Sequence, residues 1–231
     1  MVGALRIPEL ARRDRFIKRV VAEGGVHVGV TASDIVSVAS PRVRGRRVAL
    51  LWSSRADAER WTPVVEDGAA VEAVSLGVLA GEIVGVLGER RMLVGLDWNI
   101  DPLEVELTPA DLLERLQLEA VEAFVHGLRT TRTVWVLEDA DGPAVMPSNI
   151  DAAHVLLPVW TDRVAAERHI GGDWSEAVAL EIPLDRFVSM TLPWLAEQGW
   201  RLAPTPWEGG FGPEIGPAEI GHRLSALLAA A

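Results

Sequence analysis

The residues best suited to do chemistry form a set of one tryptophan, two arginines and one glutamate that occurs twice. A guanidinium can hold a carboxylate or phosphate through two parallel hydrogen bonds, so each set could form a pocket for such an anion. The alternative is structural, because arginine and glutamate four residues apart on a helix pair with each other, and tryptophan can anchor a core. The two sets are Trp52, Arg55, Glu59 and Arg60, and Trp160, Arg163, Glu167 and Arg168.

A second candidate is an acidic stretch with tryptophan that could bind a basic protein. Residues 97–122 contain eight acidic residues, and Arg115 is the only basic residue among them. A surface of one charge sign attracts a partner of the opposite sign, and tryptophan is enriched at the centres of protein interfaces. The alternative is a solvated acidic face beside tryptophans at the core edge. We assign to the docking surface Asp97, Trp98, Asp101, Glu104, Glu106, Trp207 and Glu208.

The sequence contains no recognisable catalytic or metal-binding motif. Cysteine is absent, which excludes disulfides, thiolate metal sites and cysteine nucleophiles. The five histidines show no H-E-x-x-H spacing, and no G-x-S-x-G motif is present. The glycine-rich segment 207–212 lacks the lysine of a phosphate-binding loop and is expected to be a turn. We therefore expect no catalytic residue, no metal and no cofactor, and favour a protein that is not an enzyme.

Charge and hydropathy limit the possible partners. The formal net charge of the 231-residue chain is −11, which disfavours nucleic-acid binding over the whole surface. The segment 42–47 contains four arginines and is expected to be a solvated loop, with a contact to an anion as the alternative. No apolar run is long enough to span a bilayer, and the N-terminus shows no secretory signal. We expect a cytoplasmic protein that does not engage a membrane.

The chain repeats itself at the offset that places Trp52 on Trp160, which we call the repeat offset. At this offset, residues 52–61 match 160–169 at five of ten positions, and residues 106–116 match 214–224 at five of eleven. Such matches at one fixed period indicate a tandem repeat. We predict two units, residues 1–118 and 119–231, of which the first is the more divergent. Because no Gly/Ser/Pro-rich linker marks the boundary, we expect the units to pack as one pseudo-symmetric body.

Both copies show the same succession of helices and strands. Apolar residues in the helical period open each copy, around residues 16–21 and 121–128. Strands are expected at 26–30 and 134–137, 35–39 and 143–146, 48–52 and 155–160, and 92–96 and 200–203. Further helices are expected after each shared tryptophan, at 76–87 and 184–195, and from Pro109 and Pro217. The pattern predicts an α+β fold, in which each two-layer unit has helices on one face of a mixed or antiparallel sheet.

Several motifs of the second copy, LPVW at 157–160, IPLDRF at 182–187 and LPWLAEQG at 192–199, resemble DUF2750, a family of uncharacterised bacterial proteins. The resemblance covers residues 119–226, and the first copy resembles the family at 50–61 and 76–98. A fainter similarity links the same features to the N-terminal domain of SseB-like (enhanced serine sensitivity) proteins. The resemblance implies a small α+β domain without a known reaction. Some such bacterial families are immunity or accessory proteins that bind another protein.

Three functions fit these observations. The first is a non-enzymatic protein-binding module, of immunity or accessory type, that binds a basic partner through the acidic, tryptophan-bearing surface. The second is a binder of a small carboxylate or phosphate, or an enzyme, that uses the arginine and tryptophan sets. The third is an architectural subunit that associates with itself or with a larger assembly. We favour the first because the chain has nine tryptophans, basic and acidic residues concentrated in different segments, and no catalytic motif.

Overall fold

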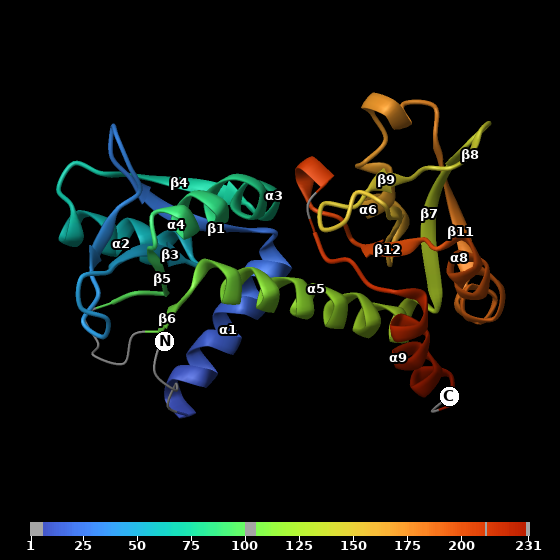
Figure 1. The fold of residues 1–231 in the computed structure, drawn as a ribbon, viewed down its shortest axis with the longest axis horizontal. Coiled ribbons are helices and arrows are strands. Elements are labelled where there is room, and N and C mark those ends of the chain that lie inside the picture. Colours follow the sequence, from blue (N-terminus) through green and yellow to red (C-terminus); the bar gives the residue numbers. More distant parts are fainter. Residues whose placement is uncertain (1–6, 100–104, 211, 230–231) are drawn as a thin grey trace. The chain divides into compact units, whose positions relative to one another are not determined.

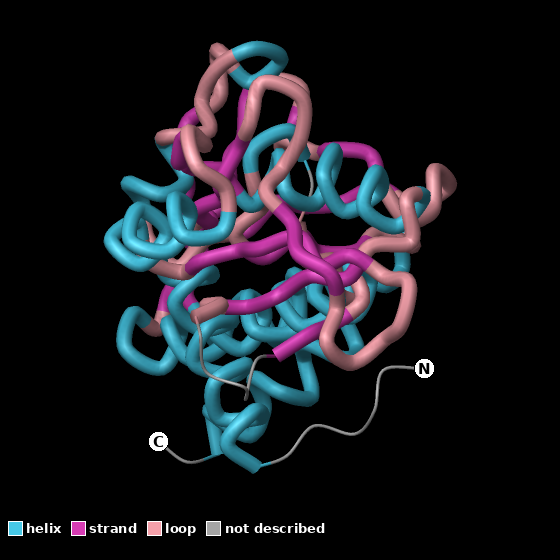
Figure 2. Tube along the Cα trace, turned by 90° about the vertical axis from the view of Figure 1, so that its left-hand side faces the viewer, coloured by secondary structure: helices cyan, strands magenta, loops and turns pink. Residues whose placement is uncertain are grey.

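Figure 1 shows the computed structural model of the chain, in which residues 7–99, 105–210 and 212–229 are described. The chain divides into two compact units. The first consists of Met1–Glu119 with Trp207–Gly209, and the second of Ala120–Pro206 with Gly210–Ala231. Helices, strands and loops are distinguished by colour in Figure 2.

The first unit is built on a six-stranded mixed sheet. Strand β3 pairs with β5 in parallel, and the other pairings are antiparallel. The strand order is β4-β1-β3-β5-β6, with β2 also paired to β3. In chain order the elements are α1 (Ile7–Glu23), β1 (Gly25–Val30), β2 (Ser37–Ala39), β3 (Arg47–Trp52), α2 (Arg55–Val65), β4 (Ala70–Ser75), α3 (Leu76–Val78), the π-helix η1 (Leu79–Ile83), α4 (Val84–Glu89), β5 (Leu93–Leu96) and β6 (Val105–Leu107).

Both faces of the central strand β3 are buried. Val48, Leu50 and Trp52 belong to a core cluster that includes Ala58 of α2. The alternate residues Ala49 and Leu51 are also fully buried, although they point to the opposite face of the sheet. Helix α1 contacts β1 and β6, whereas α2 contacts β1, β3 and β4. Helix α2 thus covers a second face of the sheet, whereas the sequence predicts helices on one face only.

The second unit repeats this order of strands. Strand β11 pairs with β7, and β10 pairs with β12 in parallel. Bridges between Trp135 and Trp160 and between Leu202 and Ile215 stand where the first unit has the β1–β3 and β5–β6 pairings. The elements are β7 (Thr133–Asp139), β8 (Gly142–Pro143), β9 (Met146–Pro147), β10 (Val155–Val159), α6 (Arg163–Glu167), η2 (Gly172–Trp174), β11 (Val178–Pro183), α7 (Leu184–Arg186), the π-helix η3 (Phe187–Thr191), α8 (Leu192–Gln198), β12 (Arg201–Pro204) and α9 (Pro217–Ala229). The short 3-10 helix η4 (Glu208–Gly210) lies before α9 in the chain, and its first two residues belong to the first unit.

Two clusters of buried side chains form the core of the second unit. The larger joins α5 (Pro109–Thr131) to β7, β10, α8 and α9, and includes Phe124, Phe187 and Leu202. The smaller surrounds Trp160 and includes Ala166 of α6. Residues 134 and 136 of β7 belong to the larger cluster and residue 137 to the smaller, as the two-residue period of a strand requires.

The repeat offset holds for the backbone as well as for the sequence. The π-helical turns η1 and η3 start at residues 79 and 187, which correspond to each other at this offset. A positive φ recurs at the corresponding pairs Gly24 and Arg132, Arg91 and Gly199, and Asp97 and Thr205. The unit therefore requires a left-handed turn at these positions, even where one copy has lost the glycine that adopts it without strain. The α+β class and the tandem repeat are both confirmed.

Several elements differ from their predicted bounds. The last helix of the first copy and the first helix of the second form one helix, α5, because residues 117–120 are Gln, Leu, Glu and Ala, which all favour helix. The strand predicted at 143–146 is divided between β8 and β9. Strands β4 and β11 were not expected, because they lie at sheet edges and many of their residues are exposed, which weakens the apolar pattern.

Candidate functional site

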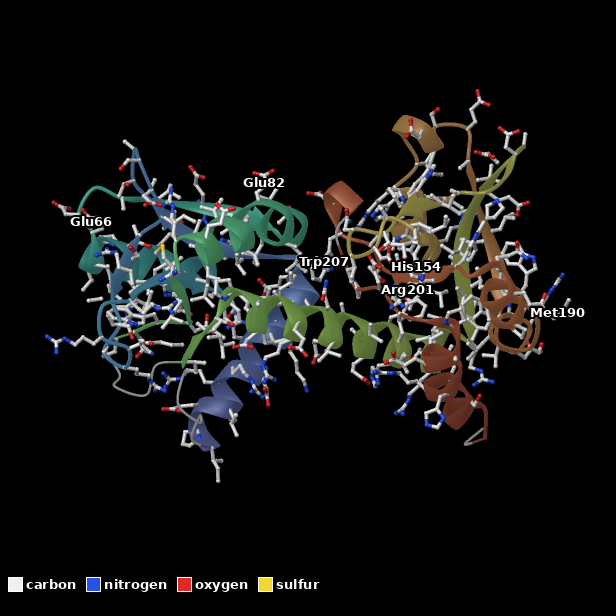
Figure 3. All side chains as sticks on the ribbon, viewed as in Figure 1. Glu66, Glu82, His154, Met190, Arg201 and Trp207 are labelled. Atoms are coloured by element: carbon white, nitrogen blue, oxygen red, sulfur yellow. The ribbon has the colours of Figure 1, made fainter. Side chains whose placement is uncertain are left out.

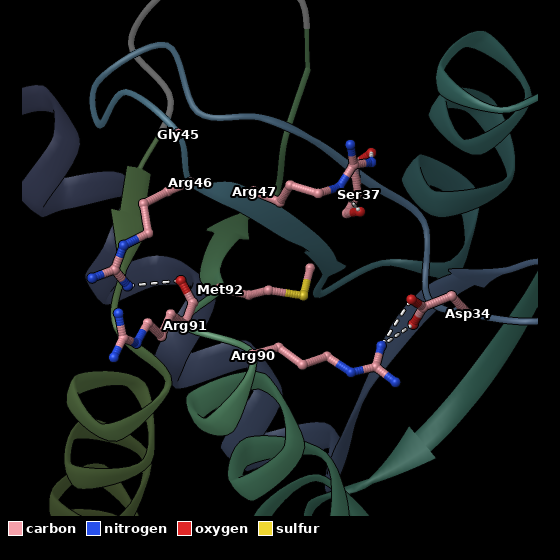
Figure 4. Close-up of a pocket in the computed structure, with 8 residues that line it drawn as sticks. All are labelled: Asp34, Ser37, Gly45, Arg46, Arg47, Arg90, Arg91 and Met92. Carbon is pink, nitrogen blue, oxygen red and sulfur yellow. Dashed lines mark hydrogen bonds and ion pairs between the residues drawn. The ribbon is translucent and has the colours of Figure 1, made fainter.

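A pocket lined by four arginines is the clearest candidate site in the part of the chain that the structure describes (Figure 4). It lies in the first unit and has a volume of about 510 Å³. A single lining residue, Asp34, is acidic, and the buried Met92 lies between the arginines. The lining consists of Asp34, Ser37, Gly45, Arg46, Arg47, Arg90, Arg91 and Met92.

The parallel pairing of β3 with β5 brings the two arginine pairs together. Arg46 and Arg47 lie at the start of β3, and Arg90 and Arg91 lie directly before β5. Val48 pairs with Leu93, so both segments reach the same edge of the sheet although they are far apart in sequence. The sequence run 42–47 contains Arg46 and Arg47, and nothing in the sequence connects it with Arg90 and Arg91.

Hydrogen bonds hold three of the four guanidiniums in place. Arg47 donates from Nε to the Ser37 hydroxyl over 2.9 Å and from Nη2 to the Ser37 carbonyl over 2.6 Å. Arg46 Nη1 donates to the carbonyl oxygen of Arg91 over 2.7 Å. Arg90 Nη1 lies 2.9 and 2.8 Å from the two carboxylate oxygens of Asp34. Arg46 and Arg47 are thus positioned by neutral acceptors, and no carboxylate of the described residues pairs with either charge.

The second copy provides an internal comparison for these arginines. At the repeat offset, His154 stands for Arg46, Val155 for Arg47, Gln198 for Arg90 and Gly199 for Arg91. The second unit forms the corresponding strands β10 and β12 without any of the four charges. The fold therefore does not require arginine at these positions. This contrast between the copies is visible in the sequence, but only the strand pairing shows that the four positions lie together.

The repeated tryptophan sets have a different geometry from an anion pocket. Trp52 and Trp160 are fully buried. Arg55 donates to Glu59 over 2.8 Å and Arg163 to Glu167 over 2.6 Å, as exposed helical pairs. Arg60 and Arg168 are also exposed, and the Arg60 guanidinium lies 5.0 Å from the ring centre of Trp61. The structure does not bring these arginines together with the shared tryptophans around the described pocket.

The residues assigned to the acidic docking surface are divided between core and surface. Glu106 and Trp207 (Figure 3) are buried, Trp98 is half-buried, and Glu208 is exposed. Asp101 and Glu104 lie outside the described residues. Exposed carboxylates of the same stretch include those of Asp111 and Glu114. A docking surface in this region would therefore depend on the exposed acids rather than on Glu106.

Asp97 is used inside the first unit. Its two carboxylate oxygens accept from the Ser53 backbone N–H over 2.7 Å and from the Ser53 hydroxyl over 2.9 Å. Burial raises the pKa of Asp97 above its ordinary value of 3.8, and the two hydrogen bonds from Ser53 oppose this effect. The folded protein therefore holds a proton on Asp97 at a higher pH than the unfolded chain does.

We expect Asp97→Asn to change how stability depends on pH. Because the folded-state pKa is raised, Asp97 favours the folded state most at low pH, and this contribution falls as pH rises from 3.8 through the folded pKa. Asparagine can keep both bonds to Ser53 and tolerates the positive φ of 47°. Urea unfolding of both proteins from pH 4 to 7 should show the wild type losing stability relative to the variant. A difference that stays constant or grows with pH would contradict the raised pKa.

Two serine–glutamate pairs, which the sequence analysis did not single out, occupy equivalent positions in the two units. Ser40 donates to Glu106 and Ser148 donates to Glu214, both over 2.7 Å. Each serine hydroxyl also accepts from the backbone N–H groups two and three residues further on. Each pair thus fixes a loop to the unit, and its recurrence at the repeat offset indicates a structural role.

The family comparison agrees with the repeat. The model of a family described as "Protein of unknown function (DUF2750)" matches residues 13–116 and again residues 121–224. The chain belongs to this family and contains two copies of its domain, as the resemblance in the sequence predicts. No curated protein matches the chain.

Two solved structures show a weak similarity. One, "Anabaena Tic22 (protein transport)", is 12% identical with a TM-score of 0.27, over 84% of this chain and 93% of that chain. The other, Tic22 from Plasmodium falciparum, is 9% identical with a TM-score of 0.25, over 81% and 91%. At these TM-scores the similarity supports no argument about function.

The described residues contain neither a metal-binding cluster nor a helix that could span a membrane. No three histidine or acidic side chains among them lie close enough to hold a metal ion. Helices that combine the length and the apolar composition of a membrane span are also absent from this part of the chain.

Proposed function

We propose that this protein is a non-catalytic binding protein whose first unit recognises an anionic group through Arg46, Arg47, Arg90 and Arg91. The observation that carries the proposal is the excess of positive charge in one pocket, whose lining includes four arginines and a single carboxylate. Guanidinium groups bind carboxylate and phosphate oxygens in planar, paired hydrogen bonds. The absence of all four arginines from the second copy supports a role in binding, because a role in folding would apply to both copies.

The proposal differs from our sequence-based hypothesis in the sign of the partner's charge. We still propose a protein that binds a ligand rather than catalysing a reaction, and a cytoplasmic location. The proposed binding surface is now the arginine pocket instead of the acidic stretch. The carboxylate or phosphate site is likewise proposed in this pocket and not at the two tryptophan sets, where Arg55 and Arg163 pair with glutamate and Arg60 lies over the ring of Trp61.

The second copy suggests the variant that tests this proposal. Arg46→His, Arg90→Gln and Arg91→Gly introduce the residues of the second unit, and glycine suits the φ of 53° at position 91. At pH 8 and low salt, calorimetric titration with citrate and with inorganic tripolyphosphate should detect binding to the wild type. The triple variant should bind at least about tenfold more weakly, since each arginine contributes charge-assisted hydrogen bonds.

A matched control removes the same number of positive charges elsewhere. Arg60→Gln, Arg163→Gln and Arg168→Gln change exposed arginines of the tryptophan sets, none of which lines the pocket. We expect this control to bind the probes as the wild type does. Equal loss in both variants would show that only net charge matters, and loss in the control alone would favour the tryptophan sets.

A second candidate function remains the binding of a basic protein, as for an immunity or accessory protein. The observation that favours it is the exposure of Asp111 and Glu114 at the start of α5, within a chain of net charge −11. A basic partner recovered with the wild type at low salt should be lost when both residues are neutralised. High salt should also release it, because exposed charges are screened there.

A further inference from the structure

We infer that the arginine pocket takes a small polyanion with two or more linked phosphate groups, rather than a single carboxylate or an acidic protein segment. This inference rests on the proposed anion-binding function and adds the class of ligand. It is carried by the charge of the pocket, by the arrangement of its arginines in two pairs, and by its size.

The charge of the pocket exceeds what a monoanion can neutralise. Its lining carries four guanidiniums and one carboxylate, which gives a net charge of three positive units. A lone carboxylate would leave two of these uncompensated, whereas a chain of two or three phosphates carries about three or four negative charges at pH 8. Guanidiniums are always protonated in proteins, so the pocket keeps this excess at every physiological pH.

The guanidiniums of the four arginines form two pairs, one on each side of the Met92 side chain (Figure 4). Arg46 and Arg47 enter from the start of β3 and Arg90 and Arg91 from the turn after α4, but the side chains of Arg46 and Arg91 end on one side of Met92, and those of Arg47 and Arg90 on the other. A ligand with linked anionic groups can engage both pairs at once, and the second group then binds without a new loss of translational freedom. A ligand with one anionic group engages one pair and leaves the other unused.

Most hydrogen-bond donors of these arginines are not used within the pocket. A guanidinium offers five N–H donors. Arg46 and Arg90 each use a single nitrogen in the bonds to Arg91 and Asp34. The bonds already made fix the side chains, and the remaining donors can reach several acceptor oxygens. Linked phosphates present many such oxygens in a small volume, which fits a pocket of about 510 Å³.

The test compares anions that differ in chemistry and in charge. Orthophosphate, pyrophosphate, tripolyphosphate, citrate and a hexaglutamate peptide are titrated by calorimetry into the wild-type full chain at pH 8. We expect tripolyphosphate to bind at least about tenfold more tightly than orthophosphate and more tightly than citrate. The triple variant with Arg46→His, Arg90→Gln and Arg91→Gly should lose this preference, while its thermal unfolding remains close to that of the wild type.

The outcomes separate this inference from the proposed function. If citrate or orthophosphate binds as tightly as tripolyphosphate and the triple variant loses that binding, the anion site stands and the polyphosphate inference fails. Tighter binding of hexaglutamate than of tripolyphosphate also overturns the inference, in favour of an acidic protein partner. If no anion binds the wild type, or if the triple variant binds as well as the wild type, both proposals fail.

Discussion

Replacing Trp52 by phenylalanine is expected to destabilise the protein by about 2–4 kcal/mol, clearly more than the equivalent change at Trp160. Both tryptophans are fully buried and occupy equivalent positions in the two copies, so both changes leave a similar small cavity. The Trp52 indole N–H donates to the carbonyl oxygen of Trp98 over 2.9 Å, whereas the Trp160 N–H finds no acceptor among the described residues. Trp52→Phe therefore breaks a bond, while Trp160→Phe removes an unpaired donor and should cost only about 1 kcal/mol.

The free energies of unfolding in urea test this difference, with alanine at both positions as the control. Alanine removes the whole ring at each site, so Trp52→Ala and Trp160→Ala should each cost about 3–5 kcal/mol. Hydrogen exchange followed by mass spectrometry assigns the loss to one unit or the other. A Trp160→Phe variant as unstable as Trp52→Phe would show that the hydrogen bond to Trp98 adds little.

The repeated fold could be predicted because the information is local and present twice. Continuous apolar runs at 48–52 and 155–160 predict the central strands, and the shared tryptophans define the repeat offset. The π-helical turns could not be predicted, because residues 79–83 and 187–191 differ in sequence and nothing in either marks an i→i+5 bond. The merged helix α5 was missed because a repeat boundary need not interrupt a helix.

The arginine pocket could not be predicted because it depends on which strands are neighbours. Arg46 and Arg90 are distant in sequence, and only the parallel pairing of β3 with β5 brings them to one edge. A run of charge in the sequence says nothing about such pairings. Glu106 shows the opposite error. Its charge suggests an exposed position, but the residue is 1% exposed and accepts a hydrogen bond from the Ser40 hydroxyl. Acidic residues are rarely buried without a partner, and such a partner is visible only in the fold.

The two partners of each buried serine–glutamate pair should show a large coupling free energy of unfolding, and the larger value is expected in the first unit. Removing either partner leaves a buried polar group unsatisfied, so Ser40→Ala and Glu106→Ala are each expected to cost about 2–4 kcal/mol. Hydrogen bonds to charged groups contribute about 1.5–3 kcal/mol, which sets the coupling expected from the double-mutant cycle. In the second unit, Glu214 also accepts from the Asn149 N–H over 3.0 Å, and its carboxylate lies 4.0 Å from Arg201.

These extra partners should reduce the coupling in the second unit, because Glu214 remains partly satisfied when Ser148 is removed. The four variants of each cycle, at 40 and 106 and at 148 and 214, are compared by urea unfolding under the same conditions. We expect a larger coupling free energy for the first pair, by about 1 kcal/mol. Because Leu93 stands in the first unit where the second has Arg201, the variant Arg201→Leu should bring the second cycle closer to the first. Equal couplings in both units before that change would show that Arg201 and Asn149 do not share the carboxylate.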